Sequence, residues 1–194
     1  MESNMRIVEE ARKPVAMNPK KFALWLFMGS VVMIFAAFTS YYIVRQADGG
    51  WTPVQLPDTF LYNTVIIILS SLVLHWAYIS AKKNELGQVK IGVILASVLG
   101  VAFLVGQFWG WSDLVAINVH FVSSDSLHSM IYVLTLVHGA HLVSGVVVLG
   151  ILLVKTLRFK IHSKNMTTME MSVTYWHFLG GLWLYLFVFL LVNN

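Results

Sequence analysis

The sequence predicts an all-α integral membrane protein, built as a bundle of five transmembrane helices. Hydrophobic residues make up 58% of the chain and charged residues only 11%, whereas a soluble domain carries about 25% charged residues. Five apolar segments are each near or above the roughly 20 residues that a helix needs to cross the hydrocarbon core of a bilayer. Helices are expected because lipid offers backbone amides no other partner outside a closed barrel. The continuous apolar runs also lack the alternation typical of a membrane β-barrel.

Charged residues bound each of these segments, and none lies inside one. We expect a tail at residues 1–21, followed by one membrane domain at residues 22–194. The expected helices cover residues 22–44, between Lys21 and Arg45; 60–80, between Asp58 and Lys82; 91–111, between Lys90 and Asp113; 127–154, between Asp125 and Lys155; and 173–192, after Glu170. The fourth segment is the longest, so it can tilt or protrude from the membrane.

The basic residues predict the orientation of the bundle. Of the 13 lysines and arginines, all but Arg45 lie in the tail, in the second loop or in the fourth loop. In a five-pass chain these three regions lie on the same side of the membrane. Because cytoplasmic loops carry an excess of Lys and Arg, we expect the N-terminus in the cytoplasm and the C-terminus outside.

Composition excludes several classes of function. The chain has no cysteine, which excludes thiolate metal sites, iron–sulfur clusters and c-type haem attachment. The net charge of +4 is explained by basic cytoplasmic loops, so we expect no nucleic-acid partner. All nine acids lie outside the five spans. Ion-coupled transporters usually place charged groups at membrane depth, so their absence argues against a pump.

Three histidines at or within membrane depth most need an explanation, namely His177 in the fifth apolar segment and His138 and His141 in the fourth. His138 and His141 are the closest pair. They are three residues apart and therefore share a helical face, with Gly145 near the same face and Gly139 beside it. Small residues beside polar ones are typical of a face that packs tightly against another helix and hydrogen-bonds across the contact. Neutral imidazole is also the commonest metal ligand. A metal takes three or four ligands, however, and this spacing supplies two, with His177 as the nearest further candidate. We predict helix packing, and keep metal or haem ligation as the less favoured alternative.

Other polar residues receive smaller roles. Asn63-Thr64 and Ser70-Ser71 are expected to form interhelical hydrogen bonds, worth about 0.6 kcal/mol each. Aromatic residues near the predicted helix ends, namely Trp51, Trp109, Trp111 and Tyr62, are expected to anchor the helices at the membrane interface. His75 is interpreted as a polar residue near the interface, and His120, His128 and His162 receive no role.

Four segments, in order and with matching topology, resemble subunit III of the haem-copper terminal oxidases, in its short five-helix bacterial form. The first is Trp25-Leu26-Phe27-Met28-Gly29-Ser30, with Phe35 and Tyr41. The second is Leu56-Pro57, with Asn63-Thr64 and Ser70-Ser71. The third is Thr135, His138-Gly139, His141 and Gly145. The fourth is Tyr175-Trp176-His177-Phe178, with Trp183. Together they cover nearly the whole chain from Phe22 onward.

The chain departs from the family at three positions where members usually carry an acid at membrane depth. These positions hold Val31, Gly110 and Gly180. Proton buffering by a buried carboxylate of this subunit is therefore not expected here. Longer members also have two further N-terminal helices that complete a lipid-filled cleft. In this chain any such cleft must be closed by another subunit or by lipid.

The resemblance implies a non-catalytic subunit in the inner membrane of a bacterium. It would stabilise the catalytic subunit I and hold phospholipid, with haem and copper in partner subunits and no cofactor or catalytic residue of its own. The residues expected in interhelical or lipid contacts are His138, His141, His177, Trp176, Gly139, Gly145, Asn63 and Ser70. The alternatives are an independent small-molecule transporter and, less favoured, a membrane b-haem protein. The electron donor, cytochrome c or quinol, stays open because electrons enter through another subunit.

Overall fold

The computed structural model describes residues 18–49, 54, 56–121, 126–158, 161 and 166–193. Within them the chain forms five α-helices and no strand, which confirms the predicted fold class. The helices are α1 (Pro19–Ala47), α2 (Asp58–Lys82), α3 (Leu86–Ala116), α4 (Ser126–Leu157) and α5 (Thr167–Val192). Each is long and apolar enough to cross a membrane. Trp51 and His162, which were considered above, lie outside the described residues.

Every helix extends beyond the apolar segment that predicted it. At the start of α1, Asn18 accepts a hydrogen bond from the Lys20 backbone amide at 3.1 Å, so the helix begins inside the expected tail. At the start of α5, the Glu170 carboxylate forms an ion pair with Lys21 Nζ at 2.5 Å. Polar flanks can therefore be helical where capping and side-chain pairing satisfy them, although hydropathy marks only the part suited to hydrocarbon.

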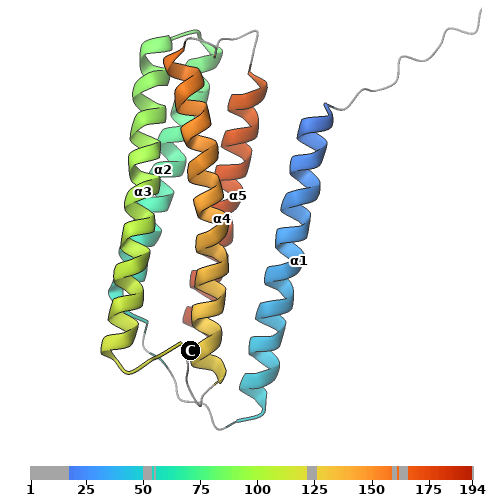
Figure 1. Ribbon diagram of the computed structural model, residues 1–194, viewed down its shortest axis with the longest axis vertical. Coiled ribbons are helices and arrows are strands. Elements are labelled where there is room, and N and C mark those ends of the chain that lie inside the picture. Colours follow the sequence, from blue (N-terminus) through green and yellow to red (C-terminus); the bar gives the residue numbers. More distant parts are fainter. Residues whose placement is uncertain are drawn as a thin grey trace, which may run out of the picture.

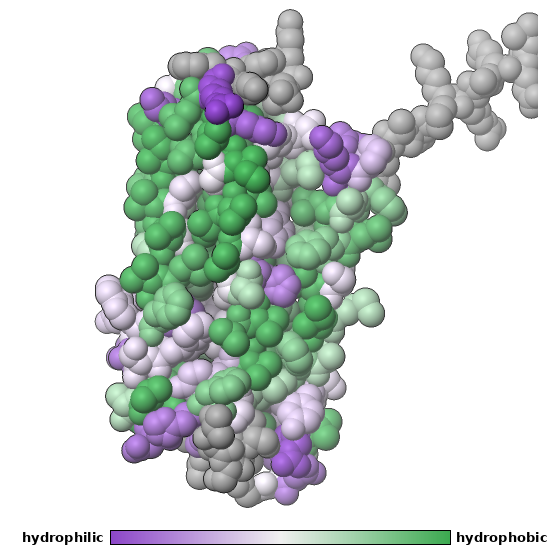
Figure 2. Space-filling model, viewed as in Figure 1, coloured by the Kyte–Doolittle hydropathy of each residue, from purple (hydrophilic) through white to green (hydrophobic). Residues whose placement is uncertain are grey.

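Four of the helices form a block, and α1 stands along one side of it (Figure 1). In the described residues, Cα atoms of α1 come within 8 Å of those of α4 and α5, but not of those of α2 or α3. The buried residues of α1 form one stripe at helical spacing: Met28, Val31, Phe35, Thr39 and Tyr42. A single stripe faces the block, so most of the surface of α1 is left for lipid or a partner. Apolar side chains cover much of the visible flank of the molecule (Figure 2).

Small residues bring helices close together inside the block. A Cβ placed on Gly92 of α3 would lie 2.7 Å from the Ala77 Cβ of α2, and one on Gly106 would lie 2.0 Å from Asn63 Oδ1. Neither position could carry a side chain without moving the partner. Close backbone approach through small residues is the usual packing mode of transmembrane helices, and it fixes α2 against α3.

The ends of the helices place the described basic segments together. α1, α3 and α5 begin at the end of the bundle where α2 and α4 finish (Figure 1). Lys82, Lys83 and Lys155 lie at or near this end, whereas Arg45 lies near the opposite end of α1. The described lysines are therefore more numerous at one end of the bundle, and the predicted orientation depends on this unequal distribution of basic residues.

Candidate functional site

His138 lies at the centre of the bundle, enclosed by aromatic rings from three other helices. Its side chain is fully buried. The ring centroid is 5.2 Å from Trp183 of α5, 6.3 Å from Phe35 of α1 and 6.4 Å from Phe103 of α3. Neither ring nitrogen has a hydrogen-bond partner among the described residues. His138 is thus a packing residue that joins four helices through ring contacts.

His141 shares this face and turns toward α1. Its ring lies 5.9 Å from Phe35 and 6.2 Å from Phe27, and its Nδ1 is 2.7 Å from the carbonyl oxygen of Val137 in its own helix. The half-buried ring therefore fills the contact between α4 and α1. The sequence placed the two histidines on one face, and both rings contact Phe35.

Hydrogen bonds from indole nitrogens to hydroxyl groups connect α5 with α2. Trp176 Nε1 donates to Ser70 Oγ at 3.1 Å, and the Ser70 hydroxyl donates to the carbonyl oxygen of Ala96 on α3 at 3.0 Å. Trp183 Nε1 donates to Thr64 Oγ1 at 3.0 Å. These groups are all buried. Ser70 and Trp176, both singled out from the sequence, thus link three helices.

A similar bond, which the sequence did not indicate, joins α3 to α4. Trp111 Nε1 donates to Thr135 Oγ1 at 3.0 Å. Trp111 stands at the end of the predicted segment, so it was interpreted as an interface anchor. Because α3 continues to Ala116, Trp111 is not at the end of the helix, and its indole reaches α4. Trp109, by contrast, is well exposed, as an interface anchor requires.

His177 lies in a second polar cluster, on the surface shared by α2 and α5. Its Nδ1 is within hydrogen-bonding distance of Ser71 Oγ, and its ring centroid is 5.5 Å from that of His75. The His75 ring also lies 6.0 Å from that of Tyr78, over which Lys82 Nζ sits at 4.3 Å. His75 is exposed, so this cluster faces outward from the bundle.

Asn63 and Gln107 are buried amides on α2 and α3. Asn63 packs against the backbone of Gly106, and its Nδ2 has no partner among the described residues. Gln107 is 2% exposed, and neither its Nε2 nor its Oε1 has a partner there. Asn63 was singled out from the sequence, but Gln107 was not. The signal for Gln107 would have been an amide side chain inside a long apolar segment.

The two glycines of the histidine face have different surroundings. A Cβ on Gly145 would lie 2.6 Å from Leu179 Cδ1 and 3.2 Å from the Trp176 ring, so this glycine permits close contact between α4 and α5. A Cβ on Gly139 would meet no atom within 4 Å, although the residue is buried. Only Gly145 is therefore required by tight packing.

The positions that lack the family's acids are filled by apolar contacts. Val31 is buried in the α1 stripe. A Cβ on Gly110 would already lie 3.3 Å from the Phe60 ring, and one on Gly180 would lie 3.6 Å from Ile67. An acid at Gly110 would collide with this ring unless Phe60 moved.

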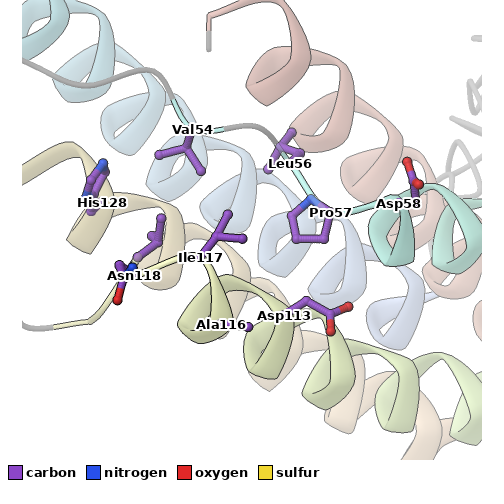
Figure 3. A pocket seen from close by; sticks show the side chains of 10 residues that line it. Val54, Leu56, Pro57, Asp58, Asp113, Ala116, Ile117, Asn118 and His128 are labelled. Carbon is purple, nitrogen blue, oxygen red and sulfur yellow. The ribbon is translucent and has the colours of Figure 1, made fainter.

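The described residues offer no group of three or more His, Cys, Asp or Glu side chains able to hold a metal ion. A pocket of about 790 Å³ lies where α2 begins and α3 ends (Figure 3). Asp58, Asp113 and His128 are in its lining, but Asp113 already accepts a hydrogen bond from Thr59. The expectation that this chain holds no cofactor stays a prediction.

Two pockets lie along α5, and together with the α5 side chains between them they are defined here as the α1–α2 groove. Its floor is the α5 stripe of Thr174, His177, Gly181, Tyr185 and Val188, which are spaced three or four residues apart and so face one side of the helix. At one end a pocket of about 340 Å³ is lined by Lys21, Trp25, Tyr78 and Thr174. Toward the other end, a more apolar pocket of about 530 Å³ includes Gly181, Tyr185 and Val188. Tyr185 donates to Thr39 Oγ1 at 3.1 Å, which holds α1 against this floor.

Comparison with known proteins gives the context of this arrangement. The family described as cytochrome c oxidase subunit III matches residues 8–193. Cytochrome c oxidase subunit 3 of Homo sapiens is 28% identical over 187 residues, which cover 90% of this chain and 70% of that protein. The protein of the same name from Yarrowia lipolytica is 28% identical over 149 residues, covering 74% of this chain and 54% of that protein. The protein of the same name from Spodoptera frugiperda is 29% identical over 139 residues, which cover 71% of this chain and 89% of that protein.

Proposed function

This chain belongs to the cytochrome c oxidase subunit III family, and on that premise we propose that it binds the catalytic subunit I of its oxidase together with phospholipid. It is a multi-pass membrane protein and a structural subunit of a respiratory oxidase complex. The observation that carries this conclusion is the family match, which extends over nearly the whole chain. Haem and copper lie in partner subunits, where oxygen is reduced to water.

The polar residues of the bundle support a non-catalytic role. Ser70, Trp176 and Trp183 are engaged in contacts between helices, and His138 is enclosed by apolar and aromatic side chains. All four side chains are buried, out of contact with the solvent from which a substrate would arrive. Their chemistry therefore serves helix association.

The complex lies in the plasma membrane of a bacterium, with the N-terminus of this chain in the cytoplasm. The gathering of basic residues at one end of the bundle supports this orientation. An independent transporter has no such support. All acids of the chain lie outside its apolar segments, and the family match points to an oxidase subunit.

The α1–α2 groove is our candidate for the phospholipid site. At one end of it Lys21 is paired with Glu170, which lines the same pocket, so the positive charge that favours an anionic headgroup there is that of Lys82, over the Tyr78 ring. The apolar floor at Gly181 and Val188 suits an acyl chain. A lipid in this position would lie beside α1, whose described Cα atoms stay more than 8 Å from those of α2.

A variant that fills the groove tests the lipid site. Gly181→Leu places a side chain where a Cβ meets no atom within 4 Å, so the subunit should fold but the purified oxidase should retain less phospholipid. Gly150→Leu, at another open glycine on α4, is the matched control and should leave the lipid content unchanged. Equal lipid content in both variants would refute this location.

Deletion of the chain tests the function as a whole. The remaining oxidase should keep its haem spectrum and most of its initial rate of oxygen consumption, but it should lose activity sooner during sustained turnover. Loss of haem from a catalytic subunit that is still present would show that this chain holds the cofactor, contrary to the proposal.

A further inference from the structure

Two contacts bracket the segments of α3 and α4 that lie side by side, and the two helices run antiparallel. Trp111 of α3 donates to Thr135 of α4. A Cβ on Gly100 of α3 would lie 3.6 Å from Val146 Cγ2 of α4. Residues 100–111 of α3 therefore run beside residues 135–146 of α4. Gln107 and Gly139 both lie within these paired segments.

Gln107 also faces α4. It lies four residues from Trp111 and four from Phe103, so all three share one face of α3. Trp111 bonds to Thr135, and the Phe103 ring contacts that of His138. Gln107 is thus on the face of α3 that contacts α4, one turn from the Phe103 ring that contacts His138. The Gln107 and His138 side chains are buried, and all four of their polar side-chain atoms are without a partner among the described residues.

Gly139 of α4 leaves open space in the same part of the bundle. Gly139 is buried, yet a Cβ placed there would have open room around it. Gly145, two turns further along α4, is by contrast in tight contact with Leu179. Room for a small group is therefore available at Gly139, next to His138 in the chain, on the stretch of α4 that runs beside the Gln107 segment of α3.

We propose that this place is a binding site for an internal water molecule, which bridges the Gln107 amide and the His138 imidazole beside Gly139. Buried polar groups in native proteins are nearly always hydrogen-bonded, to protein or to ordered water. An internal water takes two to four polar partners. The Gln107 amide supplies a donor and an acceptor, and a neutral imidazole supplies one of each. The water joins α3 to α4 one turn from the Trp111–Thr135 bond.

Cryo-electron microscopy of the purified oxidase containing this chain, at a resolution that shows ordered water, tests the site directly. A water peak is expected within about 2.6–3.2 Å of a polar atom on each of Gln107 and His138. A direct hydrogen bond between the two side chains, with no water peak between them, would overturn the proposal.

Two variants probe the same site. Gly139→Ala puts a methyl group into the space and should remove the water peak, whereas Gly150→Ala, at an open glycine on the same helix, should leave it in place. Alanine normally stabilises a helix relative to glycine, so Gly150→Ala should raise the thermal midpoint. Gly139→Ala should lower it, because the polar atoms lose their bridge. Gln107→Leu should also remove the peak. A water peak that persists in Gly139→Ala, or an equal rise in midpoint for both alanine variants, would refute the site.

Discussion

Trp176 and Ser70 form a buried hydrogen bond between α5 and α2, at 3.1 Å from the indole nitrogen to the hydroxyl oxygen. The same hydroxyl donates to the carbonyl oxygen of Ala96 on α3. One serine therefore acts as acceptor and donor between three helices. In hydrocarbon such a bond has no competition from water, and its loss would leave the indole N–H unsatisfied.

Ser70→Ala should destabilise the bundle by about 1–3 kcal/mol, the usual cost of leaving a buried polar group unpaired. The measurement is the thermal midpoint at which this subunit dissociates from the purified oxidase. Ser30→Ala is the matched control, because the exposed Ser30 hydroxyl bonds only to a carbonyl of its own helix. A similar midpoint for both variants would show that the Ser70 bond contributes little.

Gly145→Leu should deplete the subunit from the complex. The new side chain would collide with Leu179 and the Trp176 ring, and a collision within a closely packed helix contact cannot be relieved by a small shift. Gly150→Leu, five residues later on the same helix, meets open space and should be retained at the wild-type level. Quantitative immunoblotting of the purified complex gives the ratio of this subunit to the catalytic one. Normal retention of Gly145→Leu would contradict the packing described.

The double change His138→Gln and His141→Gln should leave the initial rate of oxygen consumption mostly intact. Both rings serve helix packing in the structure, so the expected cost is of the order of 1 kcal/mol in association. A deficit should develop as faster loss of activity over many turnovers. An oxidase that contains the mutant subunit but has no initial activity would show that these histidines take part in the reaction.

Single cysteines test the orientation without interference, because the chain has none of its own. Lys83→Cys lies at the end of the bundle predicted to be cytoplasmic, and Asn194→Cys follows the end of α5. In intact spheroplasts an impermeant maleimide should label only the cysteine at position 194. Labelling at position 83 alone would show the opposite orientation. Labelling at both positions would contradict the proposed topology.

The fold was predictable from the sequence because long apolar runs leave helices as the main way to satisfy the backbone in lipid. The helix ends were less predictable. The apolar segments used for prediction end at charged residues. Helix α5, however, includes Glu170, which the ion pair with Lys21 of α1 stabilises. That pairing joins residues far apart in the chain, and no local pattern announces it.

The candidate site was predictable in part. Spacing placed His138 and His141 on one face, and the Ser70 motif pointed to a polar contact. Spacing alone could not show that His138 would be enclosed by rings from α1, α3 and α5. Nor could it show that Gln107 lies on the face of α3 that contacts α4, because that depends on how the two helices pack. Partners across helices depend on packing, and packing is decided by residues such as Gly106 and Gly145.

Affinity purification of the tagged chain from native membranes in mild detergent tests the central claim, that this chain is a structural subunit of a haem-copper oxidase. The account predicts that haem, copper and oxygen-reducing activity co-purify with the tag. It also predicts that the chain, once separated from its partners, has no Soret band. Recovery of the tagged chain without an oxidase, or a Soret band carried by the separated chain, would contradict it.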